Sequence, residues 1–351
     1  MSANIVRVAV TQAEPAWLDL AAGVAKTCEL ISEAAKNNAQ LIAFPECWIP
    51  GYPCWIWARM LDVGLNIAYA KNSLRLGSPE MNQIRNCARD NEVAVSLSFS
   101  EKENHTLYIA QVMIGTDGEI KFHRRKMKPT HMERTIFGDA SGECLSSVAD
   151  LSFARVGSLA CAEHIQPLLK YHTLSQQEDI HVAAWPTPYP HDGGDSSWFM
   201  TEEGMMGSSP FSEEFVTDFR FAAGSQTVSR TYAIESQTFV LHCSQILGAS
   251  GIEKMKVSSA PPMTKPGGGC SAIFGPDGRR LTEPVESTTE DIIYGELPLD
   301  LITATKFFFD PVGHYSRPDL MSLQVCTKVK KMVREEEREP IHTVSEAQND
   351  P

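Results

Sequence analysis

The sequence predicts a mixed α/β fold, a sandwich in which helices lie outside packed β-sheets. Strand-like and helix-like segments alternate at the start of the chain, and the alternation resumes from residue 153. Each region also contains consecutive strand-like segments, and turn signals occur at 116–119 and 276–279. A purely parallel, doubly wound sheet does not require such paired strands, so we favour the sandwich.

The first half of the chain begins with an apolar, valine-rich run, which is typical of a buried strand. The segment that follows it has apolar residues at helical spacing and a polar opposite face. The expected elements are a strand at 5–12, a helix at 18–38, a strand at 41–46, a helix at 79–92 and strands at 93–103, 105–115 and 120–126.

The second half repeats this alternation and then adds further strands. The expected elements are strands at 153–161, 180–186, 238–246, 269–275 and 291–299, with helices at 165–178 and 213–236. From residue 327 the chain becomes rich in charge and poor in large apolar side chains. We therefore expect one folded domain at 1–326, followed at 327–351 by a solvated helix that frays into a disordered tail.

Composition narrows the class of partner. The chain has 351 residues, of which 42% are hydrophobic, and its formal charge is −13. This length allows a large core, and an acidic chain without a long basic block is a poor partner for nucleic acid or an anionic membrane. A small molecule is the better expectation for the ligand.

The nine cysteines contain no CxxC pair, which argues against a zinc ribbon or a disulfide scaffold. No apolar run reaches the ~18 residues of a membrane helix, and the first residues lack the continuous apolar core of a signal peptide. We expect a cytoplasmic protein whose thiols stay reduced.

Carboxylates and a basic segment form the first candidate site. Glu46 ends a strand-like segment, although a glutamate at such a place is more often exposed or capping. The segment 122–134 places several cations next to Glu133, among apolar neighbours that make a poor exposed helix. A lysine that points inward needs carboxylate partners, and Glu46 and Glu133 could supply them.

Cys161 follows a strand-like run and precedes a helical pattern. It could be a small buried hydrophobe, the commonest fate of a free cysteine. A metal site through Cys161 and His164 is weak, because no second pair with ligand spacing is present. As a nucleophile, the thiol would gain from a helix N-terminus and a nearby lysine, which favour thiolate over a free-thiol pKa of ~8.5. Trp185 and Pro186, at another strand end, could line a pocket or belong to the core.

Seven segments occur in order along the chain: FPECWIPGYP (44–53), HRRKMKPTHMER (123–134), CAEHIQPLLKY (161–171), VAAWP (182–186), SRTYAIESQTFVL (229–241), GGGCSAIFGPDG (267–278) and DPVGHYSRPDL (310–320). Together they resemble the nitrilase branch of the carbon–nitrogen hydrolases, most closely its microbial arylacetonitrilases. The resemblance extends from about Ile5 to Leu323.

The resemblance implies a Glu–Lys–Cys triad with a second glutamate. Glu46 matches the general base, Cys161 the nucleophile and Glu133 the accessory glutamate. The family's lysine directly follows the arginine pair, which selects Lys126 and leaves Lys128 as the alternative. The implied reaction converts a nitrile and water to a carboxylic acid and ammonia through a thioimidate and a thioester, without a metal or organic cofactor.

The resemblance also implies an αββα sandwich that pairs into an αββααββα dimer and can extend into spirals or filaments. Ala162 departs from the branch, which usually has tryptophan after the nucleophile, so substrate size and the acid-to-amide ratio are open. Trp55, Ala162, Trp185 and Pro186 are the expected substrate-binding residues. The alternatives are a cyanide hydratase that releases formamide and a catalytically silent, self-assembling family member.

Overall fold

The computed structural model describes residues 4–187, 224–259, 263–331 and 333 of the chain. Its strands are β1 (Ile5–Ala13), β2 (Leu41–Ala43), β3 (Ala94–Glu103), β4 (Thr106–Ile114), β5 (Ile120–Arg125), β6 (Val148–Asp150), β7 (Arg155–Ala160), β8 (Ile180–Ala184), β9 (Phe239–Gln245), β10 (Ala272–Phe274) and β11 (Asp291–Pro298).

The α-helices are α1 (Leu20–Lys36), α2 (Val63–Asn72), α3 (Pro79–Asp90), α4 (Pro167–Ser175), α5 (Gly224–Ser236), α6 (Ala249–Met255) and α7 (Asp300–Phe308). Short 3₁₀ helices are η1 (Cys54–Trp57), η2 (His131–Thr135), η3 (Gly142–Leu145) and η4 (Cys161–Ile165). Among these helices, none is long and apolar enough to cross a bilayer.

The strands form a large mixed sheet in the order β5-β4-β3-β2-β1-β9-β8-β7-β6, while β10 pairs with β9 and β11 with β1. β1 and β9 pair in parallel only at Gln12 with Ser244 and at Ala13 with Gln245. This short joint divides the sheet into a first half, β1 to β5 with β11, and a second half, β6 to β10.

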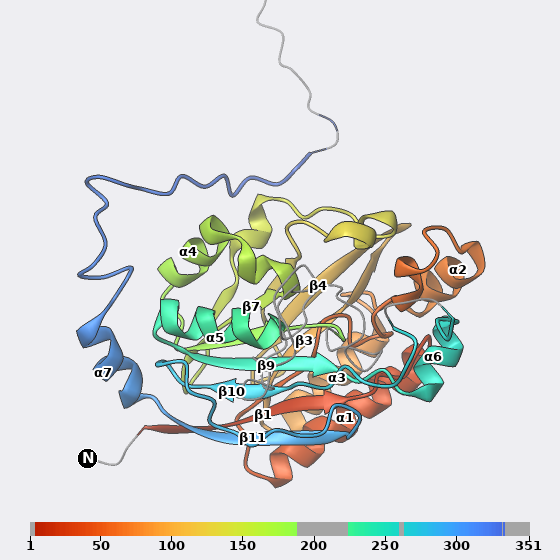
Figure 1. Cartoon of the computed structure of the whole chain (residues 1–351), viewed down its shortest axis with the longest axis horizontal. Coiled ribbons are helices and arrows are strands. Elements are labelled where there is room, and N and C mark those ends of the chain that lie inside the picture. Colours follow the sequence, from red (N-terminus) through yellow and green to blue (C-terminus); the bar gives the residue numbers. More distant parts are fainter. Residues whose placement is uncertain (1–3, 188–223, 260–262, 332, 334–351) are drawn as a thin grey trace, which may run out of the picture.

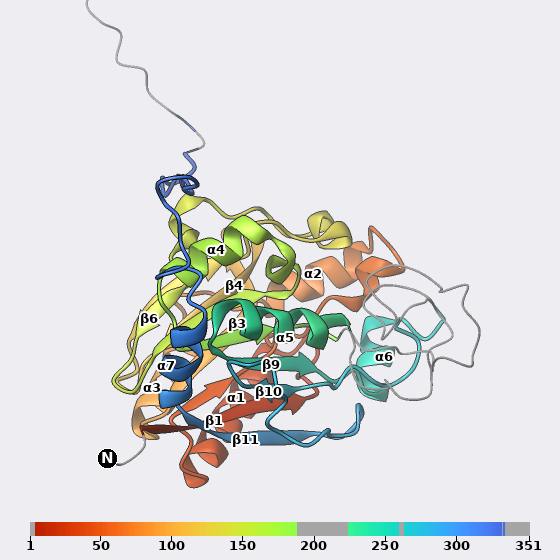
Figure 2. The same cartoon turned by 60° about the vertical axis from the view of Figure 1, so that its left-hand side comes forward.

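One apolar core contains side chains of both halves. In β1, Val6, Val8 and Val10 belong to it, and Val182 and Leu241 contribute from the second half. Because side chains alternate across a strand, Ala9 belongs to a different core together with residues of α1 and α3. A third core packs α4 and α5 against the second half. Figure 1 shows α4 and α5 on one side of the sheet and α1 on the other, and Figure 2 shows the same arrangement from another side.

The expected strands and helices of the first half are present, with small shifts at their ends. β2 is shorter than expected, so Glu46 lies beyond the strand and not at its last position. Three helices were not expected: α2, α6 and α7. The expected helix at 213–236 is present from Gly224, and its earlier part lies outside the described residues.

The segment after α7 differs from expectation. Residues 327–331 form no helix, and the rest of the expected tail, apart from residue 333, lies outside the described residues. Residues 313–331 are largely exposed, but part of this segment still contacts the folded domain. A Cβ added at Gly142 would meet the carbonyl oxygen of Cys326, so this part of the chain passes against η3.

Candidate active site

The candidate residues lie beyond strand ends that point the same way. β2 is parallel to β3, and β5 runs in the same direction because β4 is antiparallel to both of its neighbours. β7 is parallel to β8, β8 to β9, and β9 to β1. Glu46, Lys126 and Cys161 therefore follow the carboxyl ends of β2, β5 and β7, the edge where α/β sheets usually bind ligands.

Lys126 is the centre of this cluster. Its side chain is 1% exposed, and its Nζ donates to Oε1 of Glu46 at 2.8 Å and to Oε2 of Glu133 at 2.9 Å. Lys128, the alternative, is half-exposed and pairs with Asp139 at 2.6 Å. Of Lys126 and Lys128, only Lys126 lies between the carboxylates of Glu46 and Glu133.

The two glutamates differ in how their oxygens are used. Oε2 of Glu133 also accepts from the Thr130 backbone N–H at 2.7 Å, and its Oε1 accepts from the hydroxyl of Tyr52 at 3.1 Å. Oε2 of Glu46 is buried and has no hydrogen-bond partner among the described residues. A buried acceptor left free in this way is available for a proton or for substrate.

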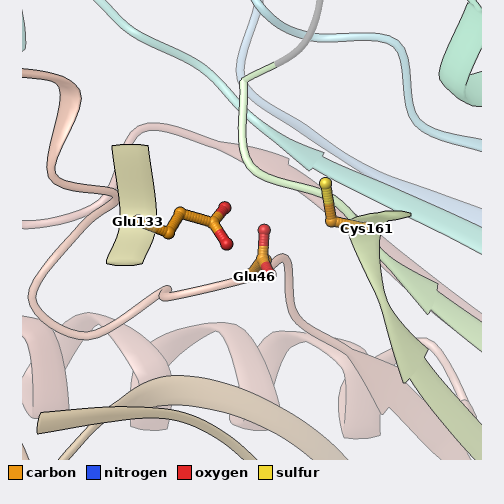
Figure 3. Close-up of side chains that lie close together, drawn as sticks. All are labelled: Glu46, Glu133 and Cys161. Carbon is orange, nitrogen blue, oxygen red and sulfur yellow. The ribbon is translucent and has the colours of Figure 1, made fainter. Parts of the chain in front are cut away.

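Cys161 completes the cluster. One oxygen of each glutamate and the sulfur of Cys161 lie within 4.8 Å of one another. Figure 3 shows the three side chains, with Glu46 between Glu133 and Cys161 in that view. The sulfur and two carboxylates are a donor set that could hold a metal ion, but the ammonium of Lys126 already lies between the carboxylates. A divalent cation would meet this fixed positive charge, so the donor set does not fit a metal centre.

Burial sets the protonation states. It raises the pKa of Glu46 to about 8, against the lowering effect of Lys126. Burial opposes the charge of Lys126, but Glu133 and Glu46 outweigh it and raise the pKa of Lys126 well above its usual value. Burial also raises the pKa of Cys161 well above that of a free thiol, with Lys126 opposing it and both glutamates adding to it. Burial and the two carboxylates therefore outweigh Lys126, which by itself favours the thiolate form of Cys161.

The backbone is held in unusual conformations around the cluster. Cys161 has φ +49°, Cys47, next to Glu46, has φ +53°, and His131, close to Glu133, has φ +44°. Left-handed conformations of residues other than glycine cost of order 1–3 kcal/mol each and concentrate at functional sites. Other described residues adopt the same conformation at turns and helix ends, so these three positions add strain at the cluster but do not by themselves mark its role.

A buried ion pair ties the Lys126 segment to the Cys161 segment. Both guanidinium Nη atoms of Arg124 donate to the carboxylate of Glu163, at 2.7 and 2.8 Å. The same carboxylate accepts from the backbone N–H of Met127 at 2.8 Å and from that of Ala160 at 2.9 Å. Arg124 outweighs burial and lowers the pKa of Glu163. An ionised carboxylate thus fixes two peptides that adjoin Lys126 and Cys161.

Of the four expected substrate-binding residues, three lie beside the cluster and one lies in an apolar core. Trp185 is buried, and its backbone oxygen accepts from the N–H of Glu46 at 3.1 Å. Pro186 follows it and is also buried, and Ala162 is partly exposed. Trp55 is buried in a core where its ring packs edge-on against Tyr69, and its indole N–H donates to Asn66. Trp185, Pro186 and Ala162 adjoin the cluster, whereas the contacts of Trp55 are those of a core residue.

Sequence reasoning gave no role to several residues that hold the cluster in place. Tyr52 donates to Glu133 and itself accepts from the indole N–H of Trp57 at 3.1 Å. Gln245 donates to the backbone oxygen of Glu46. The Arg124–Glu163 pair belongs to the same group. One signal was available, because an arginine on the inward face of a strand requires a buried anion.

Comparison with known proteins agrees with this geometry. The sequence pattern of the family described as "Carbon-nitrogen hydrolase" matches residues 7–307. An arylacetonitrilase of Hypocrea virens is 57% identical over 97% of each chain, and one of Aspergillus kawachii is 56% identical over 94% of each. A carbon–nitrogen hydrolase of Helicobacter pylori has a similar fold, with a TM-score of 0.65 at 15% identity over 90% of this chain and 96% of that one.

Proposed function

Because the chain belongs to the carbon–nitrogen hydrolase family, we propose that it hydrolyses arylacetonitriles, or arylaliphatic nitriles more broadly, to carboxylic acid and ammonia. The observation that supports this most strongly is the buried ammonium of Lys126 between two carboxylates, with a thiol within reach. We assign Cys161 as nucleophile, Glu46 as general base, Lys126 as electrostatic stabiliser and Glu133 as the group that holds Lys126.

The unpaired oxygen of Glu46 supports Glu46, rather than Glu133, as the general base. Glu133 accepts hydrogen bonds on both oxygens, so its carboxylate is fixed in place. Oε2 of Glu46 has no partner among the described residues and can take the proton of the Cys161 thiol. A thiolate is the appropriate nucleophile, because a nitrile carbon is only modestly electrophilic.

The reaction follows from this assignment. The sulfur of Cys161 bonds to the nitrile carbon while the thiol proton passes through Glu46 to the nitrogen, which gives a thioimidate. Water, deprotonated by Glu46, adds to that carbon, and Lys126 stabilises the charge that develops. Ammonia leaves and a thioester remains. A second water releases the acid and restores the thiol, so one nitrile consumes two waters.

The test is parallel incubation with phenylacetonitrile, mandelonitrile and cyanide, with ammonia, acid and amide all measured. Ammonia and arylacetic acid in matching amounts are expected from the aryl nitriles. Formamide from cyanide, without acid from either aryl nitrile, would contradict the assignment and identify a hydratase. The partly exposed Ala162, where the branch usually has tryptophan, supports acceptance of the bulkier mandelonitrile.

The rate should depend on pH through Glu46. Burial raises the pKa of this carboxyl to about 8, and the base works only when ionised, so activity is gained as pH rises through that value. With phenylacetonitrile, which does not titrate, we expect kcat/KM to rise by roughly tenfold per pH unit below about pH 8 and then to level off. A profile that is flat between about pH 6 and 9 would exclude Glu46 as a base of raised pKa.

We also propose that the layers form an αββα sandwich that pairs with a second copy into an αββααββα dimer and can grow further. Helices on the outer face of each sheet half support the sandwich. An exposed apolar run at the end of α7 supports self-association: Phe307 is 83% exposed and Phe308 is 85% exposed. Adjacent exposed aromatic side chains are unusual on a monomer and mark interaction surfaces.

We propose a reducing, cytoplasmic location, which fits the nine cysteines because all of them are free thiols.

We propose a folded domain at 1–326 and an appended segment at 327–351. Deleting the segment from Thr327 should leave the fold intact, because residues 327–331 are exposed and build no core. Circular dichroism should be unchanged, while size-exclusion chromatography should report any change in assembly.

A substitution of both phenylalanines separates folding from assembly. Phe307→Ser with Phe308→Ser should lower the assembled mass without changing the dichroism spectrum. Leu301→Ser, on the same helix at 40% exposure, is the matched control and should assemble normally. Insoluble protein after truncation at Thr327, or unchanged mass in the double variant, would contradict these assignments.

A further inference from the structure

A row of buried polar groups leads from α5 to the backbone of Cys161. The hydroxyl of Tyr232 donates to Oε1 of Glu178. Oε2 of Glu178 lies 2.8 Å from Nδ1 of His181, and the Nε2 atoms of His181 and His164 are 3.0 Å apart. Nδ1 of His164 lies 2.8 Å from the carbonyl oxygen of Cys161. Tyr232, Glu178, His181 and His164 are each at most 1% exposed.

Packing holds the two imidazole rings in place. His181 stacks on Tyr232, with ring centroids 3.9 Å apart and 27° between the planes. His164 stacks on Trp185 at 5.4 Å and 24°. Neither ring can turn without displacing an aromatic neighbour in a close-packed core. The nitrogen atoms therefore keep the partners given above.

Counting protons along the row gives its direction. The Cys161 carbonyl can only accept, so Nδ1 of His164 must carry a proton. In a neutral His164, Nε2 then accepts, and Nε2 of His181 must donate to it. Between His181 and Glu178 one further proton is needed, carried either by Nδ1 of His181 or by the carboxyl. With either placement, His164, His181 and Glu178 together carry one additional proton. The reference is the state in which both imidazoles are neutral and the carboxyl is ionised.

The surroundings place that additional proton. Burial, helped by the neighbouring His181, lowers the pKa of His164 well below its usual value, so His164 stays neutral. The proton therefore lies between His181 and Glu178, and Tyr232 stabilises the carboxylate by donating to its other oxygen. Without this proton, one contact of the row would bring two lone pairs together at 2.8 Å, either between His181 and Glu178 or between His164 and the carbonyl oxygen of Cys161.

The carbonyl of Cys161 and the N–H of Ala162 belong to one planar peptide group. The N–H of Ala162 acts on the sulfur of Cys161 and lowers the pKa of the thiol, against the larger raising effect of burial. Fixing the carbonyl thus aims the N–H at the sulfur, in a residue whose φ of +49° is unfavourable by itself. A donor at the position of Nδ1 stabilises this orientation.

We propose that His164 is a positioning residue for Cys161, that it acts through the 161–162 peptide, and that Glu178 and His181 keep the proton of His164 on Nδ1. The proposal rests on the proposed function in one respect, namely that Cys161 is the nucleophile. Glu163 holds the strand end before Cys161, whereas this row holds the peptide after it.

The test compares His164→Leu with His164→Asn, whose side-chain nitrogen can occupy the place of Nδ1. With phenylacetonitrile, His164→Leu should lower kcat by at least about tenfold while KM changes by less than about threefold, because misplacing a reacting group affects mainly the chemical step. His164→Asn should recover most of that loss. Glu178→Leu and Glu178→Gln form a second pair with the same expected order.

A second measurement does not depend on nitrile turnover. Iodoacetamide alkylation of Cys161, followed by peptide mass spectrometry, should slow in His164→Leu and recover in His164→Asn, while alkylation of the exposed Cys326 stays constant. If His164→Leu does not fold, the His164→Asn and Glu178→Gln variants decide by comparison with the unaltered protein, and a loss as large as about tenfold in both would overturn the proposal.

The two readouts separate the possible failures. If the unaltered protein releases no ammonia from any nitrile, the proposed function is wrong, and the alkylation rates still test the role of His164. If nitriles are hydrolysed but leucine and asparagine at position 164 give the same kcat and the same alkylation rate, the positioning role is wrong and the function stands.

Discussion

Replacing Cys161 by alanine is expected to abolish nitrile hydrolysis while leaving the protein folded. Cys161 provides the sulfur that lies within 4.8 Å of the oxygens of Glu46 and Glu133, and no other thiol of the described residues joins that group. Losing a nucleophile and the base step it serves should cost at least about 10²-fold in rate. The backbone conformation is equally open to alanine, and little side-chain volume is lost.

Cys243→Ala is the matched control. Cys243 is also fully buried, and burial raises its pKa, but it lies within β9 and its sulfur contacts only the carbonyl oxygen of Ala183 among the described polar groups. This variant should lose comparable packing and keep its activity. Ammonia release, compared at equal concentrations of folded protein, is the measurement. Activity above about 1% in Cys161→Ala, or an equal loss in Cys243→Ala, would remove Cys161 from the mechanism.

Periodicity explains which elements could be predicted. β1 alternates between two cores, and α1 has a buried apolar face, so both patterns are visible in the sequence. α2 was missed because its apolar residues do not mark one face: it buries Leu65 and Tyr69 but exposes Val63 and Ile67. α7 buries Ile302 alone, and its other apolar residues are exposed or half-exposed.

The inward orientation of Lys126 could be predicted from the sequence more readily than the contacts of Arg124. The inward face of β5 carries Phe122 and Arg124, and the period of two continues to Lys126, whereas Arg125 turns outward to Glu101. Lys128 lies beyond the strand. By contrast, the contact of Arg124 with Glu163 depends on how the two sheet halves pack, which no local pattern records.

The protonation of Cys161 depends on groups that no local sequence pattern brings together. A lysine near a cysteine suggested a thiolate, but the charge of Lys126 is shared with two buried carboxylates that raise the pKa of the thiol. The charge of a site depends on the whole cluster and its desolvation. In the proposed mechanism, attack begins with proton transfer to Glu46, and the raised pKa of that carboxyl suits a base operating near neutral pH.

Lys126→Met is expected to have the second large effect, and Lys128→Met provides its control. Methionine keeps much of the side-chain volume but leaves Glu46 and Glu133 without their shared cation. Two buried carboxylates cannot both stay ionised at that distance, so Glu46 would retain a proton and lose its function as base. Losing the stabilising charge alone should cost about 10²–10³-fold in kcat.

The two lysine variants should also differ in stability. Even with Glu46 protonated, Glu133 would keep a buried charge without the ammonium of Lys126. Breaking a buried ion pair in this way costs about 3–5 kcal/mol, so the Tm of Lys126→Met should fall measurably. The pair of Lys128 with Asp139 is exposed and contributes about 0–1 kcal/mol, so Lys128→Met should change neither kcat nor Tm appreciably. Measuring both quantities for both variants matters, because a general loss of folding would lower activity without identifying a role. If Lys128→Met were the more damaging substitution, the ammonium between the carboxylates would be a structural ion pair and the stabilising cation would have to be sought elsewhere.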